Sequence, residues 1–335
     1  MATIKDISRE TGLSISAVSQ VLNSKPCRIS EETKERIFET ARRLNYQKNR
    51  NAAALITNKT MRIGVIVYDI VNSSYAQCVR GIEQESLQRG RVPIVVNTIS
   101  SMKLKGGYEK LISINDVDGV IFNVVSGPHN KDLDEYIQKF SDAGKPVVFI
   151  SKTDQDLKVT NVSVDNDKGS YLATKHLLEL GHRKIGCISG PEYIAHERLN
   201  GYKQALQEYN IEYNKDYVAY GDFSFDSGYY LSKMLYDKGI RAMFIGDDQM
   251  AYGAYRMAQE NNVHVPNDLS IVGFCDLIYS SLMSVPLTTI KNPSFDIGKI
   301  ACKELLDMID QNTEWEKNII LEPELIVRDS AIYKN

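Results

Sequence analysis

Carboxylates that follow strongly apolar stretches are the first candidates for chemistry in this chain of 335 residues. They are Asp165, Asp247, Asp248 and Asp276. Carboxylates at strand ends can act as general acids and bases. The sequence has no G-x-S-x-G nucleophile elbow, no G-x-x-x-x-G-K-[ST] phosphate loop and no G-x-G-x-x-G dinucleotide loop to accompany them. We therefore interpret them as acceptors for ligand hydroxyls or amines, and we expect no enzymatic activity.

Cysteine and histidine are too scattered to predict a metal site. The histidines show no ligand spacing, and the five cysteines contain no C-x-x-C pair: Cys27, Cys78, Cys187, Cys275 and Cys302. An odd number of separated cysteines is typical of reduced thiols in a cytosolic protein. We expect no metal and no other cofactor.

A second set of polar side chains shares one face of a short helix predicted near the N-terminus. At positions i, i+3, i+4 and i+7 these side chains are Ser16, Ser19, Gln20 and Asn23. Val18, Val21 and Leu22 form the apolar stripe opposite. Solvation alone would also explain such a face, but surface helices normally carry Lys and Glu. Uncharged hydroxyls and amides can bond phosphates and base edges, so the pattern favours DNA recognition.

Capping residues predict the helices that would hold this face in position. Thr3 and Asp6 have the spacing of a capping box, and Gly12 ends the first helix. Ser14 caps the second helix, and Ser30 caps a third, which carries acidic residues in its first turn and Arg42 and Arg43 in its last. Three short helices with a tight turn after the first predict a helix-turn-helix unit.

Charge separates the chain into a basic head and an acidic body. Residues 1–60 hold 11 Lys and Arg against 6 Asp and Glu, whereas the other 275 residues hold 29 against 37. This division indicates a nucleic-acid-binding module joined to a part with another task. The sequence shows no apolar run of about 18 residues and no secretory signal, so we expect a cytoplasmic protein without a membrane partner.

From Met61 onward, apolar runs alternate with amphipathic stretches. The runs are RIGVIVY, VPIVVNT, DGVIFNVV, PVVFI, KIGCIS, AMFIG and LSIVGF, and the stretches include 75–90, 131–144, 168–181, 199–209 and 250–261. This alternation predicts parallel sheets covered by helices on both faces. About 270 residues exceed one such sheet, so we expect two doubly wound lobes that bind a ligand between them.

The N-terminal MATIKDISRETGLSISAVSQVLN, followed by ISEETKERI and LNY, resembles the DNA-binding domain of the lactose-repressor family of bacterial transcription regulators. The resemblance implies a helix-turn-helix domain over residues 1–48 that binds double-stranded DNA at a palindromic operator. It places Ile15, Ser16 and Gln20 at base-reading positions. The phosphate contacts that it implies are Thr3, Ser14, Ser19, Asn23 and Tyr46. Gln20 stands where Arg or His is common, and Ala17 where Thr is usual, so the operator sequence is not inherited.

Residues 49–60 are expected to link head and body. The segment NRNAAALI favours helix through its alanines, but eight residues do not sustain an isolated helix in water. Composition alone would make it an Ala-rich linker. The family resemblance implies instead a hinge helix that orders on DNA, with Leu55 as an apolar wedge in the minor groove. Ala53 and Lys48 replace a frequent Arg and a frequent Pro, which removes one groove contact and loosens the start of the hinge.

The remaining chain resembles the family's periplasmic-binding-protein-like effector domain in GVIVYDI, VDGVIF, KHLLELGHRKIG, RLNGYKQAL and PLTTI. The implied fold is an all-α helix-turn-helix domain plus an α/β effector domain over 61–335 with two parallel-sheet lobes. One lobe is expected at about 61–162 and 292–321, the other at about 163–291 and 322–335. The implied effector-binding residues are Ser74, Tyr75, Ser151, Arg198, Phe223, Asp247, Cys275 and Asn292. The sequence ends IVRDSAIYKN without the leucine-repeat tail of family tetramers, so we expect homodimers.

Particular residues bear on which effector binds. Arg198 offers a fork of donors to vicinal hydroxyls, carboxylate or phosphate, although the pattern alone would make it a surface ion pair. Phe223 can stack on a sugar ring or a purine, or simply belong to the core. Cys275 stands where the family usually has an acid or amide, and Asp247 replaces a common Asn. The effector is therefore not inherited by name, and we expect a sugar or sugar derivative.

We expect a repressor whose operator affinity is controlled allosterically by this effector. A solute-binding protein shares the two-lobed fold, but it needs export and has no DNA-binding head. A second alternative keeps the DNA function and replaces the effector with a phosphorylated carrier protein, as in the catabolite-control regulators of the same family. FDIGKIACKELL resembles their partner-facing segment, with Lys303 where Arg is expected. Lys is a poorer bidentate clamp for phosphate than Arg, which weakens this alternative.

Overall fold

The computed structural model describes residues 2–23, 26–46, 59–98, 111–124, 131–151, 159–191, 195–311 and 316–332. Two compact units make up the chain, a head (Met1–Thr60) and a body (Met61–Asn335). Within the described residues, no helix combines the length and the apolar content that crossing a bilayer requires.

The head consists of three helices, α1 (Ile4–Thr11), α2 (Ile15–Leu22) and α3 (Glu31–Arg43). Their predicted ends are confirmed. Gly12 follows α1 with a φ of 69°, the left-handed conformation that glycine adopts without strain. Ser14 Oγ accepts the N–H of Ala17 at 3.1 Å and thereby caps α2. Ile7 and Val18 are fully buried in the small core that joins the three helices.

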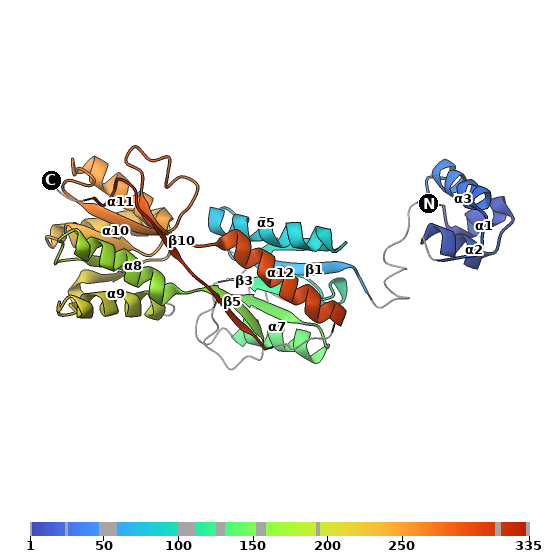
Figure 1. The fold of residues 1–335 in the computed structure, drawn as a ribbon, viewed down its shortest axis with the longest axis horizontal. Coiled ribbons are helices and arrows are strands. Elements are labelled where there is room, and N and C mark those ends of the chain that lie inside the picture. The colour runs from blue at the N-terminus through green and yellow to red at the C-terminus, as the bar shows by residue number, and fades with distance from the viewer. Residues whose placement is uncertain are drawn as a thin grey trace. The chain divides into compact units, whose positions relative to one another are not determined.

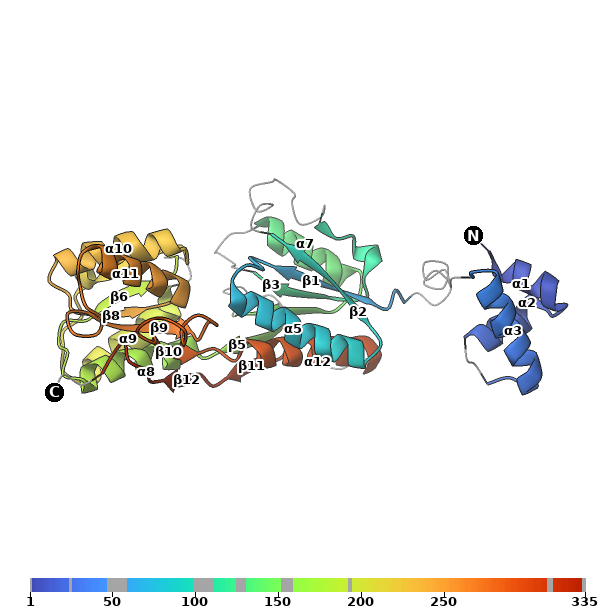
Figure 2. The same ribbon diagram turned by 90° about the horizontal axis from the view of Figure 1, so that it is seen from above.

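The first lobe of the body is a parallel sheet covered on both faces. Its strand order is β11-β5-β4-β3-β1-β2. The strands are β1 (Arg62–Val67), β2 (Val92–Asn97), β3 (Val120–Asn123), β4 (Val147–Ile150), β5 (Thr160–Val164) and β11 (Asn318–Leu321). Helices α5 (Ser73–Gln88) and α12 (Ser294–Gln311) cover one face, and α7 (Lys131–Asp142) covers the other (Figures 1 and 2).

The second lobe repeats this plan with the strand order β12-β10-β9-β8-β6-β7. The strands are β6 (Gly186–Ser189), β7 (Val218–Tyr220), β8 (Ala242–Ile245), β9 (Ser270–Cys275), β10 (Thr288–Lys291) and β12 (Glu324–Ile326). All pairs are parallel except β10 with β12. Helices α8 (Asn166–Glu179) and α9 (His196–Glu208) cover one face, and α10 (Phe225–Asp237) and α11 (Asp248–Glu260) cover the other (Figure 2). Short 3-10 turns lie at Ile114–Asp116 and Lys215–Tyr217.

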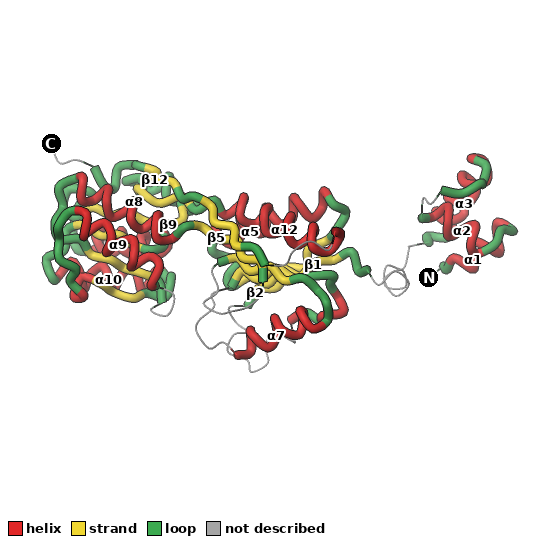
Figure 3. The backbone as a smooth tube through the Cα atoms, turned by 60° about the horizontal axis from the view of Figure 1, so that its bottom comes forward, coloured by secondary structure: helices red, strands yellow, loops and turns green. Residues whose placement is uncertain are grey.

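The chain passes between the two sheets three times: after β5, after β10 and after β11 (Figure 3). Each lobe is therefore built from segments far apart in sequence. Helix α12, for example, follows a strand of the second lobe but packs against α5 of the first. Gly81 and Gly298 permit this packing, because a Cβ on either would lie 2.0 Å from a backbone oxygen of the other helix.

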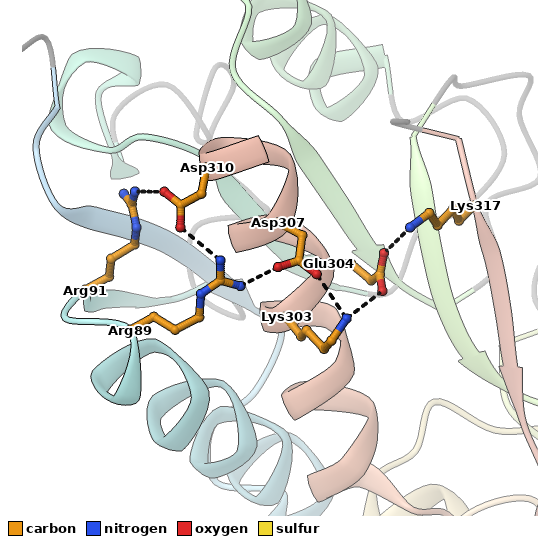
Figure 4. A network of polar contacts seen from close by, with 7 residues as sticks. All are labelled: Arg89, Arg91, Lys303, Glu304, Asp307, Asp310 and Lys317. Carbon is orange, nitrogen blue, oxygen red and sulfur yellow. Dashed lines mark hydrogen bonds and ion pairs between the residues drawn. The ribbon is translucent and has the colours of Figure 1, made fainter. Parts of the chain in front are cut away.

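Ion pairs join α12 to the end of α5 and the start of β2. Figure 4 shows Arg89, Arg91, Lys303, Glu304, Asp307, Asp310 and Lys317. The side chain of Arg91 is only 3% exposed, and its guanidinium lies 2.7 Å from Asp310 and 2.5 Å from Asp118. Asp118 also accepts the backbone N–H of Met61 at 3.0 Å. The network thus connects Met61, where the body begins, to the C-terminal end of α12.

Candidate functional site

A cavity of about 470 Å³ in the body is lined by residues of both lobes. This volume lies within the range of sites that bind small molecules. The structure brings all eight side chains expected to bind an effector to its wall: Ser74, Tyr75, Ser151, Arg198, Phe223, Asp247, Cys275 and Asn292. Their role in binding an effector stays a prediction.

Three of these residues have a left-handed backbone conformation that side chains other than glycine rarely adopt. Ser151 follows β4 with a φ of 107°, Cys275 ends β9 with a φ of 115°, and Phe223 follows β7 with a φ of 67°. Such conformations cost free energy and persist where the surrounding fold enforces them, typically at functional sites. The carboxyl ends of the strands are therefore shaped locally around the cavity.

Arg198, the third residue of α9, presents a guanidinium to the cavity. Its Cζ lies 4.5 Å from the ring centroid of Phe274 and 5.7 Å from that of Phe223. Among the residues that the structure describes, its buried Nε has no hydrogen-bond partner. A buried donor without a partner is costly, so this group is suited to donate a hydrogen bond to a ligand oxygen.

Asp247 places a buried carboxylate in the same cavity. Its Oδ1 accepts the N–H of Gln249 at 2.8 Å, which caps α11, and the thiol of Cys275 lies 3.7 Å from its Oδ2. Burial raises the pKa of Asp247 to about 6, and the hydrogen bonds and nearby Arg198 oppose this rise. Burial and the Asp247 carboxylate also raise the pKa of Cys275 well above its usual value. The thiol is therefore a weak donor rather than a nucleophile.

The other carboxylates considered as general acids or bases have structural partners. Asp248 is fully buried and accepts three hydrogen bonds, one of them at 2.6 Å from the hydroxyl of Thr289. Asp276 forms an ion pair with Arg328 at 2.7 Å. Asp165 caps α8. Across the described segments, no group of three His, Cys, Asp or Glu side chains is placed to hold a metal ion.

Further polar residues line the cavity that were not predicted from the sequence. They include Tyr68, Asn72, Asn123, Asn166, Glu197, Asp222 and Gln249. The amide of Asn72 donates to Gln249 Oε1 at 3.5 Å and so connects the two lobes. The sequence could have indicated two of them by their position. Asn123 ends β3 and Asn166 follows β5 at the start of α8, and α/β proteins bind ligands at the carboxyl ends of their strands.

The head presents a second candidate site on α2. The three residues expected to read bases, Ile15, Ser16 and Gln20, are all exposed. Ile15 is 48% exposed, which leaves its side chain available for contact with a thymine methyl group. Base reading by these side chains stays a prediction.

The expected phosphate-binding residues differ in how far they are already engaged. The hydroxyl of Thr3 donates to Asp6 Oδ2 at 2.7 Å. The amide of Asn23 donates to the backbone oxygen of Ser19 at 2.8 Å, and Tyr46 is half-buried. Ser14 accepts in its cap and keeps its hydroxyl hydrogen for another partner. The expected wedge, Leu55, lies outside the described residues.

An exposed polar helix in a helix-turn-helix head and a polar cavity between two α/β lobes together define a ligand-responsive DNA-binding regulator. Residues 3–49 match the family of bacterial regulatory proteins known as the lacI family, and residues 174–331 match the periplasmic binding protein-like domain. The chain belongs to the LacI family of DNA-binding transcriptional repressors, as the sequence resemblance predicted. The expected fold class is confirmed.

Relatives match over nearly the full chain. The HTH-type transcriptional repressor PurR of Vibrio campbellii is 31% identical over 336 residues, or 99% of each chain. Catabolite control protein A of Priestia megaterium is 31% identical over 316 residues, or 93% of each chain. The crystal structure of the lac repressor dimer bound to operator and the anti-inducer ONPF superposes with a TM-score of 0.86 at 28% identity, covering 99% of each chain. These relatives are regulators and not enzymes.

Proposed function

We propose that this repressor binds a small polar effector, a sugar or sugar derivative, in the cleft between its lobes, and that the effector sets its affinity for operator DNA. The observation that carries the proposal is the convergence of the eight expected side chains on one cavity of about 470 Å³. Phe223 supplies an apolar face, and Arg198 and Asp247 supply hydrogen-bonding groups, a combination that suits a sugar ring with its hydroxyls.

The protein acts as a cytoplasmic homodimer on a palindromic operator. The similarity to a lac repressor dimer bound to operator supports this arrangement. A two-fold symmetric dimer presents two copies of α2, so its binding site is an inverted repeat. Head residues Ile15, Ser16 and Gln20 read the two half-sites.

Control follows from the composition of the cleft wall. Ser74 and Ser151 belong to the first lobe, whereas Arg198 and Phe223 belong to the second. A ligand that bonds both sets favours one arrangement of the lobes over another, and it changes DNA affinity by the difference in its own affinity for the two arrangements. A coupling of about 1–3 kcal/mol would change affinity roughly 5- to 150-fold.

The test compares two arginine variants in a sugar screen. Arg198→Ala removes a cleft donor, and Arg256→Ala removes an exposed arginine of α11 that pairs with Glu260. A bound sugar should raise the unfolding temperature and change operator affinity in the wild type and in Arg256→Ala, and should do neither in Arg198→Ala. If the same sugar stabilised Arg198→Ala as much as the wild type, Arg198 would not belong to the binding site.

A phosphorylated carrier protein as co-effector is the second candidate, and the 31% identity to a catabolite control protein favours it. Helix α12 argues the other way. Its Lys303 ammonium already lies 3.0 Å from Asp307 and 3.7 Å from Glu304, so a phosphate would have to compete with two carboxylates (Figure 4). Pull-down by a phosphorylated carrier, lost in Lys303→Ala, would support this alternative.

A further inference from the structure

The cleft contains buried polar atoms that lack partners within the described residues. They are Nε of Arg198 and Oδ1 of Asn166 and Asn292. The orientation of the Asn166 amide is set by its nitrogen, which donates to Glu197 Oε2 at 2.8 Å and leaves the oxygen without a donor. Two of the three atoms are acceptors, so a ligand that reaches all three must supply donor hydrogens as well as an acceptor.

Three helix starts around the cleft are capped by side chains of the protein itself, which reduces the number of backbone amides that an anion could use. Backbone amides at a helix N-terminus bind phosphate when no side chain caps them. Here the caps pair Asn72 with the amide of Ser74, Asp247 with that of Gln249 and Ser224 with that of Ser227, at distances between 2.8 and 3.1 Å. The first turns of α5, α10 and α11 are thus capped, whereas Ala195 makes no side-chain cap at the start of α9, so discrimination against an anion depends on the charge of the cavity wall.

Acidic groups outnumber the guanidinium on the described part of the cavity wall. The carboxylates are those of Asp69, Glu197, Asp222 and Asp247, against Arg198 and the imidazole of His196. Asp247 is the most consequential because it is only 5% exposed. A phosphate beside it would place like charges where little water screens them.

We infer that the cleft takes an uncharged, polyhydroxylated ligand, an unphosphorylated sugar, and discriminates against sugar phosphates and sugar acids. This inference rests on the proposed function, in which the cleft is the effector site. Sugar hydroxyls act as donors toward Asn166, Asn292 and Asp247 and as acceptors toward Arg198. The phosphoryl group of a sugar phosphate dianion has no donor hydrogen, so it can bond Arg198 but not the carboxylate or the amide oxygens of the wall.

Matched pairs of ligands test the inference on the full-length protein without DNA. The probes are glucose, ribose, fructose and cellobiose, the monophosphates of the three monosaccharides, gluconate, and inorganic phosphate. Thermal unfolding identifies the ligands that stabilise the protein, and calorimetry measures their affinities. An uncharged sugar should bind at least roughly tenfold more tightly than its phosphate, which corresponds to about 1.4 kcal/mol. Inorganic phosphate should leave the unfolding temperature unchanged.

A variant pair shows whether the cleft charge causes the discrimination. Asp247→Asn removes a carboxylate of the cleft and keeps its shape, whereas Asp216→Asn removes an exposed carboxylate outside the cavity wall. The ratio of sugar to sugar phosphate affinity should fall several-fold in Asp247→Asn and stay unchanged in Asp216→Asn. Equal ratios in both variants would overturn the role given to Asp247.

The outcomes separate this inference from the proposed function. Tighter binding of a sugar phosphate, or stabilisation by no uncharged sugar of the panel, overturns the inference. If the phosphate also changes operator affinity, the proposed control by a cleft ligand stands. If an uncharged sugar binds through Arg198 without changing operator affinity, the ligand class stands and the proposed control fails.

Discussion

Replacing Arg91 by alanine should destabilise the body more than the removal of an exposed ion pair would. The Arg91 guanidinium bonds Asp118 and Asp310, and the side chains of Arg91 and Asp118 are only 3% and 7% exposed. Removal of Arg91 takes the guanidinium away from a carboxylate that is only 7% exposed, and weakening such a buried ion pair is costly. Asp118 also accepts the N–H of Met61, so the loss affects the place where the body begins.

The structure sets the expected size of this effect. Breaking a buried ion pair by deleting one partner typically costs about 3–5 kcal/mol. Asp310 keeps Arg89 at 2.9 Å, and Asp118 keeps the backbone N–H of Met61, so we expect the lower end, about 3 kcal/mol. Arg89→Ala is the matched control. The side chain of Arg89 is 24% exposed, and its partner Asp307 keeps Lys303, so it should cost about 1 kcal/mol.

Urea unfolding of the full-length variants, followed by far-UV circular dichroism, measures the difference. With a slope of about 3 kcal/mol per molar urea, Arg91→Ala should lower the midpoint of the body by about 1 M. The double variant Arg91→Met with Asp118→Leu removes both charges and should recover much of the loss. Equal midpoints for Arg91→Ala and Arg89→Ala, both close to wild type, would refute the reasoning from burial.

Three further predictions concern DNA and pH. Gln20 can pair with the N6 and N7 edge of adenine, so Gln20→Arg should shift the facing base toward guanine by about 1–3 kcal/mol; an unchanged consensus in selection from random DNA would reject this. Leu55→Ala should weaken operator binding by a few kcal/mol without lowering the unfolding temperature, and unchanged DNA bending in a gel-shift assay would reject the wedge. Burial raises the pKa of Asp248 to about 7, so native Asp248 keeps a proton that the unfolded chain releases above about pH 4. The stability of wild type relative to Asp248→Asn should therefore fall between about pH 4 and pH 7, and a difference independent of pH would contradict this.

The head was predictable because its helix signals are local. A capping residue and the amide that it accepts lie within three residues of each other, as Ser14 and Ala17 or Ser30 and Thr33 do. Gly12 likewise marks the end of α1 through its own backbone conformation. Sequence proximity was enough to place all three helices.

The body was only partly predictable, because several of its strands are short or polar. Strands β5, β7, β10, β11 and β12 were not foreseen, nor were helices α10 and α12 assigned as elements. β12 has only three residues, and β11 pairs with β5 across more than 150 positions of sequence. Such elements are stabilised by distant partners and carry little local pattern of their own.

The cleft shows the same limit in its side chains. The family resemblance placed Arg198 and Asp247 on positions that now line one cavity, but it did not indicate that Arg198 stacks on Phe274. It also gave no sign of the left-handed backbone at Ser151 and Cys275. These features depend on how strand ends from both lobes meet, which no local sequence window contains.

Contact between one ligand and both lobes also constrains how this repressor can respond. Coupling between two binding sites is reciprocal, so an effector that weakens operator binding must itself bind the operator complex more weakly, by the same factor. A corepressor must show the opposite change. Measuring the affinity of one sugar with and without operator therefore determines the direction of control independently of any assay of repression. Arg198→Ala removes one contact of the ligand with the second lobe, so any weak binding that this variant retains should be less coupled to DNA than binding by the wild type.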